Sequence, residues 1–130
     1  MLVRCANLLA VAAMEPTRPR LMPEIAPIVL AGATGDLGGR IAAALTGRGA
    51  KVRAVVRRSS APEKIDWLRQ LGVTITEVRY DSIAELSAAC SGGSCLVSAL
   101  SGLRDVILEA QSRLLEAALD AAVPRFIPSD

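Results

Sequence analysis

The stretch PIVLAGATGDLGGR, residues 27–40, decides the fold of this 130-residue chain. Its first residues form a short apolar run, which is typical of a strand buried on both faces. Glycines follow at positions 32, 35 and 38, and the chain then continues with a helical pattern that ends near Gly47 and Gly49. We expect the buried face of this helix to consist of Leu37, Ile41, Ala44 and Leu45.

The three glycines suit a strand–turn–helix junction that binds phosphate. Gly32 lets the chain turn sharply as it leaves the strand, and Gly35 lets the backbone approach a pyrophosphate closely. Gly38 lets the helix pack tightly on the sheet. The helix N-terminus would then present free N–H groups and the positive end of its dipole to the phosphates. The flanking strand and helix favour this interpretation over a tight turn that binds no ligand.

The rest of the sequence repeats the alternation of strand and helix. Strands are expected over residues 52–56, 73–78 and 95–100, and a fifth begins at residue 125. Two helices are expected to begin at capping boxes, one from Ser60 to Glu63 and one from Ser82 to Glu85, and a long helix follows from about residue 105 to 122. The order βαβαβαβαβ predicts an α/β fold with a doubly wound parallel sheet, because helical crossovers between parallel strands are right-handed.

Residues 1–24 differ from this pattern and are expected to form an extension outside a domain of residues 25–130. An apolar stretch from Cys5 to Met14 follows Arg4, so a signal peptide or a transit peptide is an alternative, and Met22 would also serve as a start. Prolines at positions 16, 19, 23 and 27 disfavour regular structure. We therefore expect this extension to be unstructured.

The composition excludes several classes of protein. With 52% hydrophobic and 22% charged residues the chain can build a core, and no apolar run reaches the roughly 18 residues of a membrane helix. A net charge of +2 and 2% aromatic residues disfavour a nucleic-acid interface. The sequence has no His, the commonest metal ligand, and its three cysteines lack CxxC spacing, so we expect no metal site. We expect free thiols in a reducing, cytoplasmic compartment.

The residues after the second strand predict which dinucleotide the turn would bind. An acidic residue there would hold the ribose 2′-hydroxyl of NAD, whereas a basic residue would meet the 2′-phosphate of NADP. Here the strand runs into Arg57 and Arg58, and the first acid is Glu63. A guanidinium binds phosphate through two hydrogen bonds, so NADP is preferred to NAD. Solvated loop charges are the alternative, above all for Arg58, and Lys64 is a weaker candidate.

Residues at the ends of the third and fourth strands also lie where ligands bind in open α/β sheets, at the carboxyl ends of strands. Asp81 follows the third strand and could contact the adenine amino group, although capping of the next helix would explain it equally well. Ser98, Ala99 and Leu100 end the fourth strand and face the crevice where the strand order reverses. Small residues there would admit a cofactor, but they would also suit core packing.

Several segments together resemble the NmrA-like and isoflavone-reductase-like families, which are atypical short-chain dehydrogenases. They are GATGDLGGRI (32–41), VRAVVR (52–57), LGVTITEVRYDS (71–82), LVSAL (96–100) and LLEAALDAAVPRFIPSD (114–130). The resemblance implies an NADPH-binding Rossmann domain in which Arg57 meets the 2′-phosphate and Ser129 lies at the nicotinamide end. It also implies that the turn holds the pyrophosphate through Gly32, Thr34, Gly35, Asp36, Leu37 and Gly38.

The sequence departs from these families in its catalytic residues. The families continue past this point into a substrate-binding half, so the catalytic Lys of the isoflavone-reductase branch has no counterpart here. The YxxxK pair of short-chain dehydrogenases is also missing, since Tyr80 is followed four positions later by Ala84. We therefore expect the chain to form only the cofactor-binding portion of such a protein, with a sheet that is incomplete after its fifth strand. We also expect the chain to have low stability as a free monomer.

Two functions follow from the resemblance. In the first, a longer parent protein is an oxidoreductase that transfers a hydride from NADPH to a small-molecule acceptor, and this chain supplies no catalytic residue. In the second, the protein is a non-catalytic NAD(P)-sensing regulator that binds a protein partner. The discriminating region would lie beyond residue 130.

Overall fold

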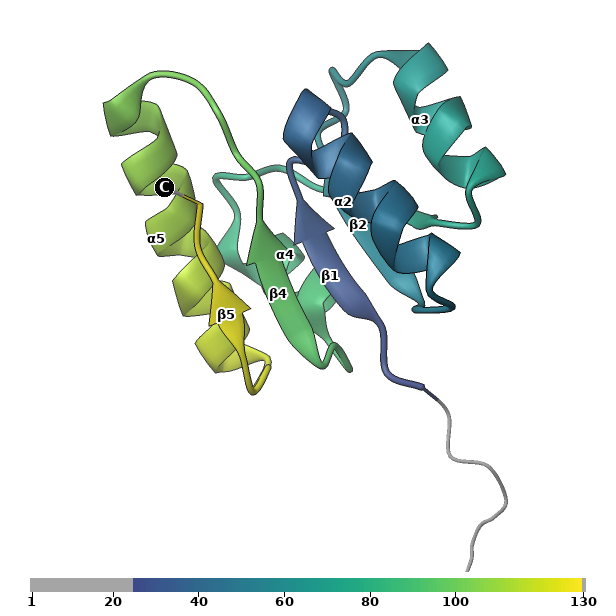
Figure 1. The fold of residues 1–130 in the computed structure, drawn as a ribbon. Helices are drawn as coiled ribbons and strands as arrows, with labels where there is room; N and C mark the ends of the chain where they lie inside the picture. The colour runs from purple at the N-terminus through teal and green to yellow at the C-terminus, as the bar shows by residue number, and fades with distance from the viewer. Residues whose placement is uncertain (1–24, 130) are drawn as a thin grey trace, which may run out of the picture.

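The strand–turn–helix unit that opens the domain is formed as the sequence predicts. The computed structural model describes residues 25–129; the extension expected over residues 1–24 lies outside this range. Strand β1 (Ile28–Ala31) runs into the glycine turn, and helix α2 (Asp36–Gly47) follows directly (Figure 1).

The remaining elements complete a five-stranded sheet in which all pairings are parallel. They are β2 (Val52–Val56), α3 (Pro62–Gln70), β3 (Thr74–Glu77), α4 (Ile83–Cys90), β4 (Cys95–Ser98), α5 (Arg104–Asp120) and β5 (Phe126–Ile127). The strand order β3-β2-β1-β4-β5 confirms the doubly wound α/β fold, with the order reversing between β1 and β4. Helices α2 and α3 cover one face and α4 and α5 the other (Figure 1).

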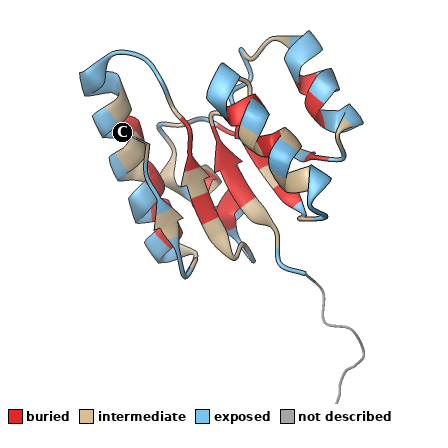
Figure 2. Ribbon diagram, in the orientation of Figure 1, coloured by how far each residue is buried: buried red, intermediate tan, exposed pale blue. Residues whose placement is uncertain are grey.

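Strand β1 lies between two hydrophobic layers, one on each face of the sheet. Val29 and Ala31 pack with residues of α4, β4 and α5 on one face, whereas Leu30 packs with residues of α2, β2 and α3 on the other. All three residues are fully buried, and the buried residues are concentrated along the inner strands (Figure 2). The continuous apolar pattern of β1 follows from this burial on both faces.

The first predicted capping box, at Ser60, is wrong. The N-cap of α3 is Ala61, no side chain caps the helix, and Pro62 occupies its first turn. The reason is Pro62, because a residue that precedes proline is pushed out of the helical region. Ala61 has an extended backbone, with φ −62° and ψ 126°, so the helix cannot begin earlier. The Ser60 N–H instead closes a turn by donating to the Arg57 carbonyl at 3.0 Å.

The second predicted capping box is formed only in part. The Ser82 hydroxyl accepts a hydrogen bond from the Glu85 N–H at 3.2 Å and caps α4. The Glu85 carboxylate does not return to Ser82. It accepts from the Arg79 N–H at 2.9 Å and the Arg79 Nε at 2.8 Å, and the Arg79 backbone N–H and side chain lower the pKa of Glu85.

The predicted buried face of α2 is confirmed only in part, because Ile41 and Leu45 are partly buried and pack against the core, but Leu37 and Ala44 are not buried. Leu37 is 58% exposed and Ala44 is also exposed, whereas Gly38, Gly39 and Ala42 are buried. Glycines at positions 38 and 39 bring the helix so close to the rest of the domain that the small residues form its contact face. The bulkier Leu37 is thereby turned outward.

The edges of the sheet are formed by β3 and β5. Ile127 of β5 is 53% exposed, as expected for a fifth strand that pairs on one side only in the described part of the chain. Between residues 25 and 129, no helix combines the length and the apolar character that a bilayer crossing requires.

Candidate functional site

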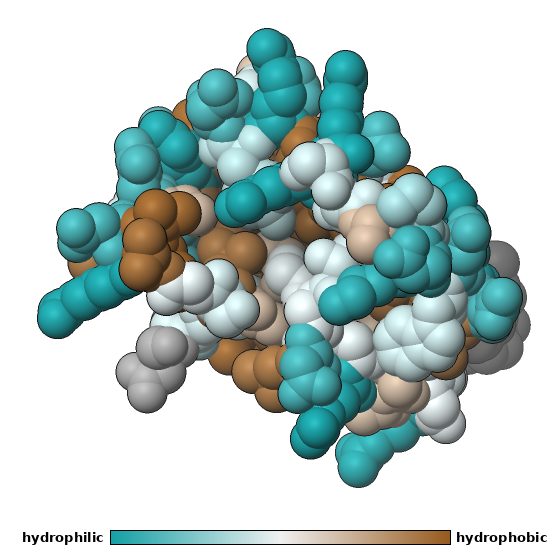
Figure 3. All heavy atoms as spheres, turned by 90° about the horizontal axis from the view of Figure 1, so that it is seen from above, coloured by the Kyte–Doolittle hydropathy of each residue, from teal (hydrophilic) through white to brown (hydrophobic). Residues whose placement is uncertain are grey.

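A pocket of about 250 Å³ opens at the carboxyl ends of β1, β2 and β4, where the strand order reverses. In open α/β sheets this crevice is where ligands bind. Figure 3 shows this edge of the domain from above, with hydrophilic side chains gathered around its rim. The pocket is lined by Gly32, Thr34, Gly35, Val55, Val56, Arg57, Ser59, Ser60, Tyr80, Ala99, Leu100 and Ser101.

Two of the three glycines are required by the packing of the protein itself. Gly32 has a φ of +82°, and a Cβ there would lie 2.6 Å from the Ala99 carbonyl oxygen. A Cβ at Gly38 would overlap the Gly32 carbonyl oxygen and lie 2.6 Å from its carbon. Gly38 thus packs the helix against the turn rather than directly on the sheet, and the turn in turn packs against the end of β4.

Gly35 is different, because contacts within the protein do not require a glycine at this position. Its backbone is extended, with φ −85° and ψ 176°, which any residue adopts. Among the described residues, a Cβ there would come within 4 Å of the Gly32 carbonyl oxygen alone, at an ordinary contact distance of 3.4 Å. A side chain at this position would therefore project into space that the protein does not fill.

Gly35 is also the N-cap of α2, and it leaves the helix N-terminus without a side-chain cap. The first bond of the helical ladder runs from the Gly39 N–H to the Gly35 carbonyl at 2.9 Å. The N–H groups of residues 36–38 precede that bond and have no acceptor within the helix. This arrangement can donate several hydrogen bonds to an anion, helped by the helix dipole.

Arg57 and Tyr80 form one wall of the pocket. The guanidinium carbon of Arg57 lies 5.0 Å from the centre of the Tyr80 ring, within the range of a cation–π contact. The Tyr80 hydroxyl donates to the Val55 carbonyl at 3.1 Å. Burial raises the pKa of Tyr80 to about 12, against the opposing effect of the Arg57 charge. Sequence reasoning missed Tyr80 as a site residue; its place directly before Asp81 was the only signal.

Not all predicted residues reach this pocket. Ala99 lines it, but Arg58 lies in a separate cavity of about 200 Å³ beside α3. Asp81 is exposed and does not line the pocket, and neither does the exposed Leu37. Asp36 is paired with Arg40 at 3.4 Å on the outer surface of α2.

Ser98 and Ser129 lie close to each other, but outside the pocket lining. Ser98 is buried, and its hydroxyl donates to the Ser129 hydroxyl at a long 3.5 Å. Gln111 of α5 fixes the backbone of Ser129, accepting from its N–H at 2.7 Å and donating to its carbonyl at 3.1 Å. The segment after β5 is therefore held against α5 beside the end of β4.

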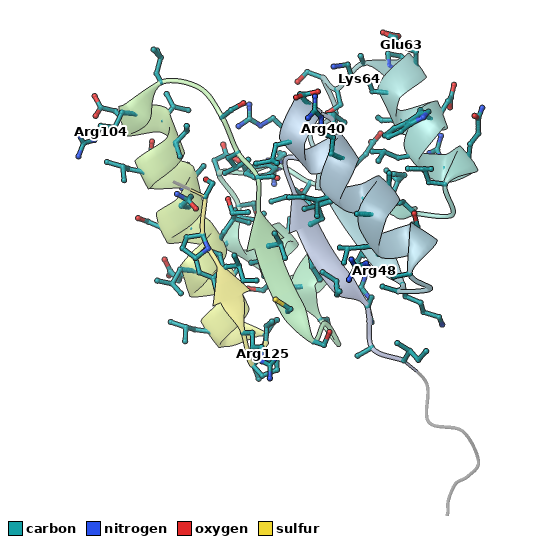
Figure 4. All side chains as sticks on the ribbon, viewed as in Figure 1. Arg40, Arg48, Glu63, Lys64, Arg104 and Arg125 are labelled. Atoms are coloured by element: carbon teal, nitrogen blue, oxygen red, sulfur yellow. The ribbon has the colours of Figure 1, made fainter. Side chains whose placement is uncertain are left out.

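Lys64 lines a second groove, of about 350 Å³, between α2 and α3. Figure 4 shows Lys64 and Glu63 at the start of α3 and Arg40 near the start of α2, at the same end of the domain. This groove shares Thr34 and Gly35 with the main pocket, so Lys64 and Arg57 approach the turn within different cavities.

The groups that line this pocket are suited to binding an anion. The Tyr80 hydroxyl, a potential proton donor in the pocket, is engaged with a backbone carbonyl and has a raised pKa. The turn and the helix N-terminus present amide donors, and Arg57 adds a positive charge, so the pocket is chemically suited to an elongated, phosphate-bearing ligand.

Comparisons with known proteins agree with this geometry. The sequence profile of the NmrA-like family matches residues 26–130. The chain is similar to the structure of AtPrR2 with NADP+ and (+)pinoresinol, at 26% identity and a TM-score of 0.75, covering 84% of this chain and 38% of that one. It is also similar to an isoflavone reductase, at 27% identity and a TM-score of 0.71, over 82% of this chain and 36% of that one.

A bacterial structure gives the same result. It is a nucleoside-diphosphate-sugar epimerase from Pseudomonas aeruginosa, at 26% identity and a TM-score of 0.69, covering 79% of this chain and 32% of that one. The chain thus spans about a third of the length of these structures, between 32% and 38%. No curated protein sequence matches it. With the profile covering nearly all of the described residues, the chain belongs to the NmrA-like family.

Proposed function

We propose that this chain binds NADPH as the cofactor domain of a reductase that acts on a small molecule. The observation that carries the proposal is Gly35, which lines the pocket at the uncapped N-terminus of α2 and has room beside it that the packing of the protein does not fill. AtPrR2, a relative of the same fold, has been determined with NADP+ and (+)pinoresinol. The reaction and the substrate of the whole protein are part of the proposal.

The pyrophosphate would lie over Gly35, at the N-terminus of α2. The N–H groups of residues 36–38 would donate to its oxygens, and the helix dipole would favour its charge. Thr34 and Gly32 line the same part of the pocket. A dinucleotide placed here would direct one end toward Arg57, beyond β2, and the other toward the ends of β4 and β5.

NADPH is proposed over NADH because of the charge beyond β2. Arg57 lines the pocket, and its planar guanidinium suits a 2′-phosphate. Ser59 and Ser60 line the same pocket and add hydroxyl donors. When bound, NADPH would supply a hydride; the residues of this chain would hold it and orient it. A reducing, cytoplasmic compartment is part of the proposal.

Isothermal titration of the chain with NADPH and NADH tests the proposal, with two matched variants. Gly35→Val should lower NADPH affinity at least about tenfold, because its side chain would occupy the place of the pyrophosphate. Gly47→Val at the other end of α2 should bind like the wild type, since nothing lies within 4 Å of a Cβ there. Unchanged NADPH binding by Gly35→Val, or no binding of either coenzyme by the folded wild type, would contradict the proposal.

A further inference from the structure

Tyr80 connects the parts of the pocket that lie on different strands. Its ring lies beneath the Arg57 guanidinium, at 5.0 Å, and its hydroxyl donates to the carbonyl of Val55 at the end of β2. The side chain thus reaches from the segment after β3 to the end of β2, and it lines the same pocket as Gly32 of the glycine turn.

Arg57 has few other constraints on its position. Its side chain is exposed at the mouth of the pocket. Across residues 25–129, the ion pairs within 4.0 Å involve Arg40, Arg69, Arg79 and Arg113, but not Arg57. A long exposed side chain with no carboxylate partner samples many rotamers, and selecting one of them on binding costs affinity. The flat ring of Tyr80 is the contact that favours one placement.

We infer that Tyr80 is a positioning residue for cofactor specificity, whose ring holds Arg57 where it meets the 2′-phosphate of a dinucleotide. The inference rests on the proposed function and adds the residue that makes Arg57 selective for the phosphorylated coenzyme. Tyr80 acts through Arg57, so its contribution concerns the discrimination between phosphorylated and unphosphorylated coenzyme rather than binding as a whole.

The anchoring of the ring supports this role. The phenol is protonated at neutral pH with its ordinary pKa of about 10. Burial raises that pKa to about 12, so the phenol keeps donating to the Val55 carbonyl into the alkaline range as well. A ring fixed at its far end presents the same face to Arg57 before and after a ligand enters. The contact is preformed, which reduces the ordering that binding requires.

The test is a double-mutant cycle on the full chain, with isothermal titration of NADPH and NADH. The measured quantity is the ratio of the NADH dissociation constant to that of NADPH. Tyr80→Leu, which removes the ring, should lower the ratio about two- to fivefold, the range of a cation–π contact at an exposed site. Tyr80→Phe, which keeps the ring, should retain most of it. In an Arg57→Leu background, Tyr80→Leu should leave the remaining ratio unchanged.

The outcomes separate this inference from the proposed function. If the wild type binds neither coenzyme, the proposed function fails. The inference is overturned if the wild type binds both coenzymes and Tyr80→Leu keeps the wild-type ratio of dissociation constants. It is also overturned if Tyr80→Leu lowers this ratio by the same factor in the Arg57→Leu background, because Tyr80 would then not act through Arg57. Because the ratio compares two ligands in one variant, a general loss of pocket structure cancels.

A second measurement applies even if Tyr80→Leu does not fold. In the wild-type chain, NMR should show the Arg57 side-chain protons shifted upfield by the Tyr80 ring current, and Tyr80→Phe should preserve most of that shift. Arg57 protons at random-coil positions in the folded wild type would mean that the contact is not populated, which would overturn the inference.

Discussion

At the scale of single residues, the three glycines of the turn divide into two kinds. Gly32 and Gly38 are needed because backbone from another part of the chain lies where a Cβ would be. Gly35 has space beside it and is needed, in this account, by the ligand. The sequence pattern shows three glycines at equal intervals and cannot separate these causes, because the separation depends on how closely the end of β4 approaches the turn.

Gly38→Ala tests the packing role. The added Cβ would overlap the backbone of Gly32, which cannot move without moving β1. We expect a loss of about 3 kcal/mol or more in the free energy of unfolding, measured by urea denaturation. Gly47→Ala is the control; it has no neighbour within 4 Å and should be neutral or stabilising by up to about 1 kcal/mol. A Gly38→Ala chain as stable as the wild type would show that the turn is less tightly packed.

The residues that sequence reasoning missed are those whose role depends on tertiary contacts. Tyr80 faces Arg57 only because β2 and β3 pair side by side, which brings their carboxyl ends together. Gln111 is an ordinary polar residue of a helix until the segment after β5 docks on it. Predictions for Arg57 and Ala99 were easier, since a residue at the carboxyl end of a parallel strand lies near the crevice by topology alone.

At the scale of elements, local signals predicted the strands and helices well, and they failed where two signals compete. Ser60 and Glu63 have the spacing of a capping box, but Pro62 sets the start of α3 one residue later. The doubly wound parallel sheet was predicted from the alternation of strand and helix, since right-handed crossovers leave few other topologies; the order β3-β2-β1-β4-β5 comes from the structure. The buried face of α2 was predicted only in part: Ile41 and Leu45 pack against the core, but glycine positions, which carry no hydrophobic signal, form much of the contact.

The two capping serines give a matched pair of variants. Ser82→Ala should lower the free energy of unfolding by about 1 kcal/mol, because the Glu85 N–H loses its acceptor. Ser60→Ala should change it by less than about 0.5 kcal/mol, because the Ser60 side chain does not cap α3. Both values come from urea denaturation monitored by circular dichroism. Equal losses in the two variants would contradict the assignment of the caps.

At the scale of the whole molecule, the described residues form both layers of the domain around β1, and leave β5 at an edge of the sheet. The outer surface of α5 carries Leu108, Leu115 and Leu119, each at least 44% exposed. The relatives compared here are longer, with this chain covering 32–38% of their length. Low stability of the isolated chain stays a prediction. The two functions, a reductase and an NAD(P)-sensing regulator, also stay predictions.

The proposed function depends on backbone amides at the start of α2 that would bind the pyrophosphate of a dinucleotide. The most direct test is an NMR titration of the amide signals of the chain with NADPH, with 2′-AMP as a ligand that lacks the pyrophosphate. NADPH should shift the amide signals of residues 35–38 most strongly. 2′-AMP should shift the signals near Arg57 and leave those of residues 35–38 unchanged. NADPH binding that leaves the signals of residues 35–38 unchanged would contradict this role of the amides.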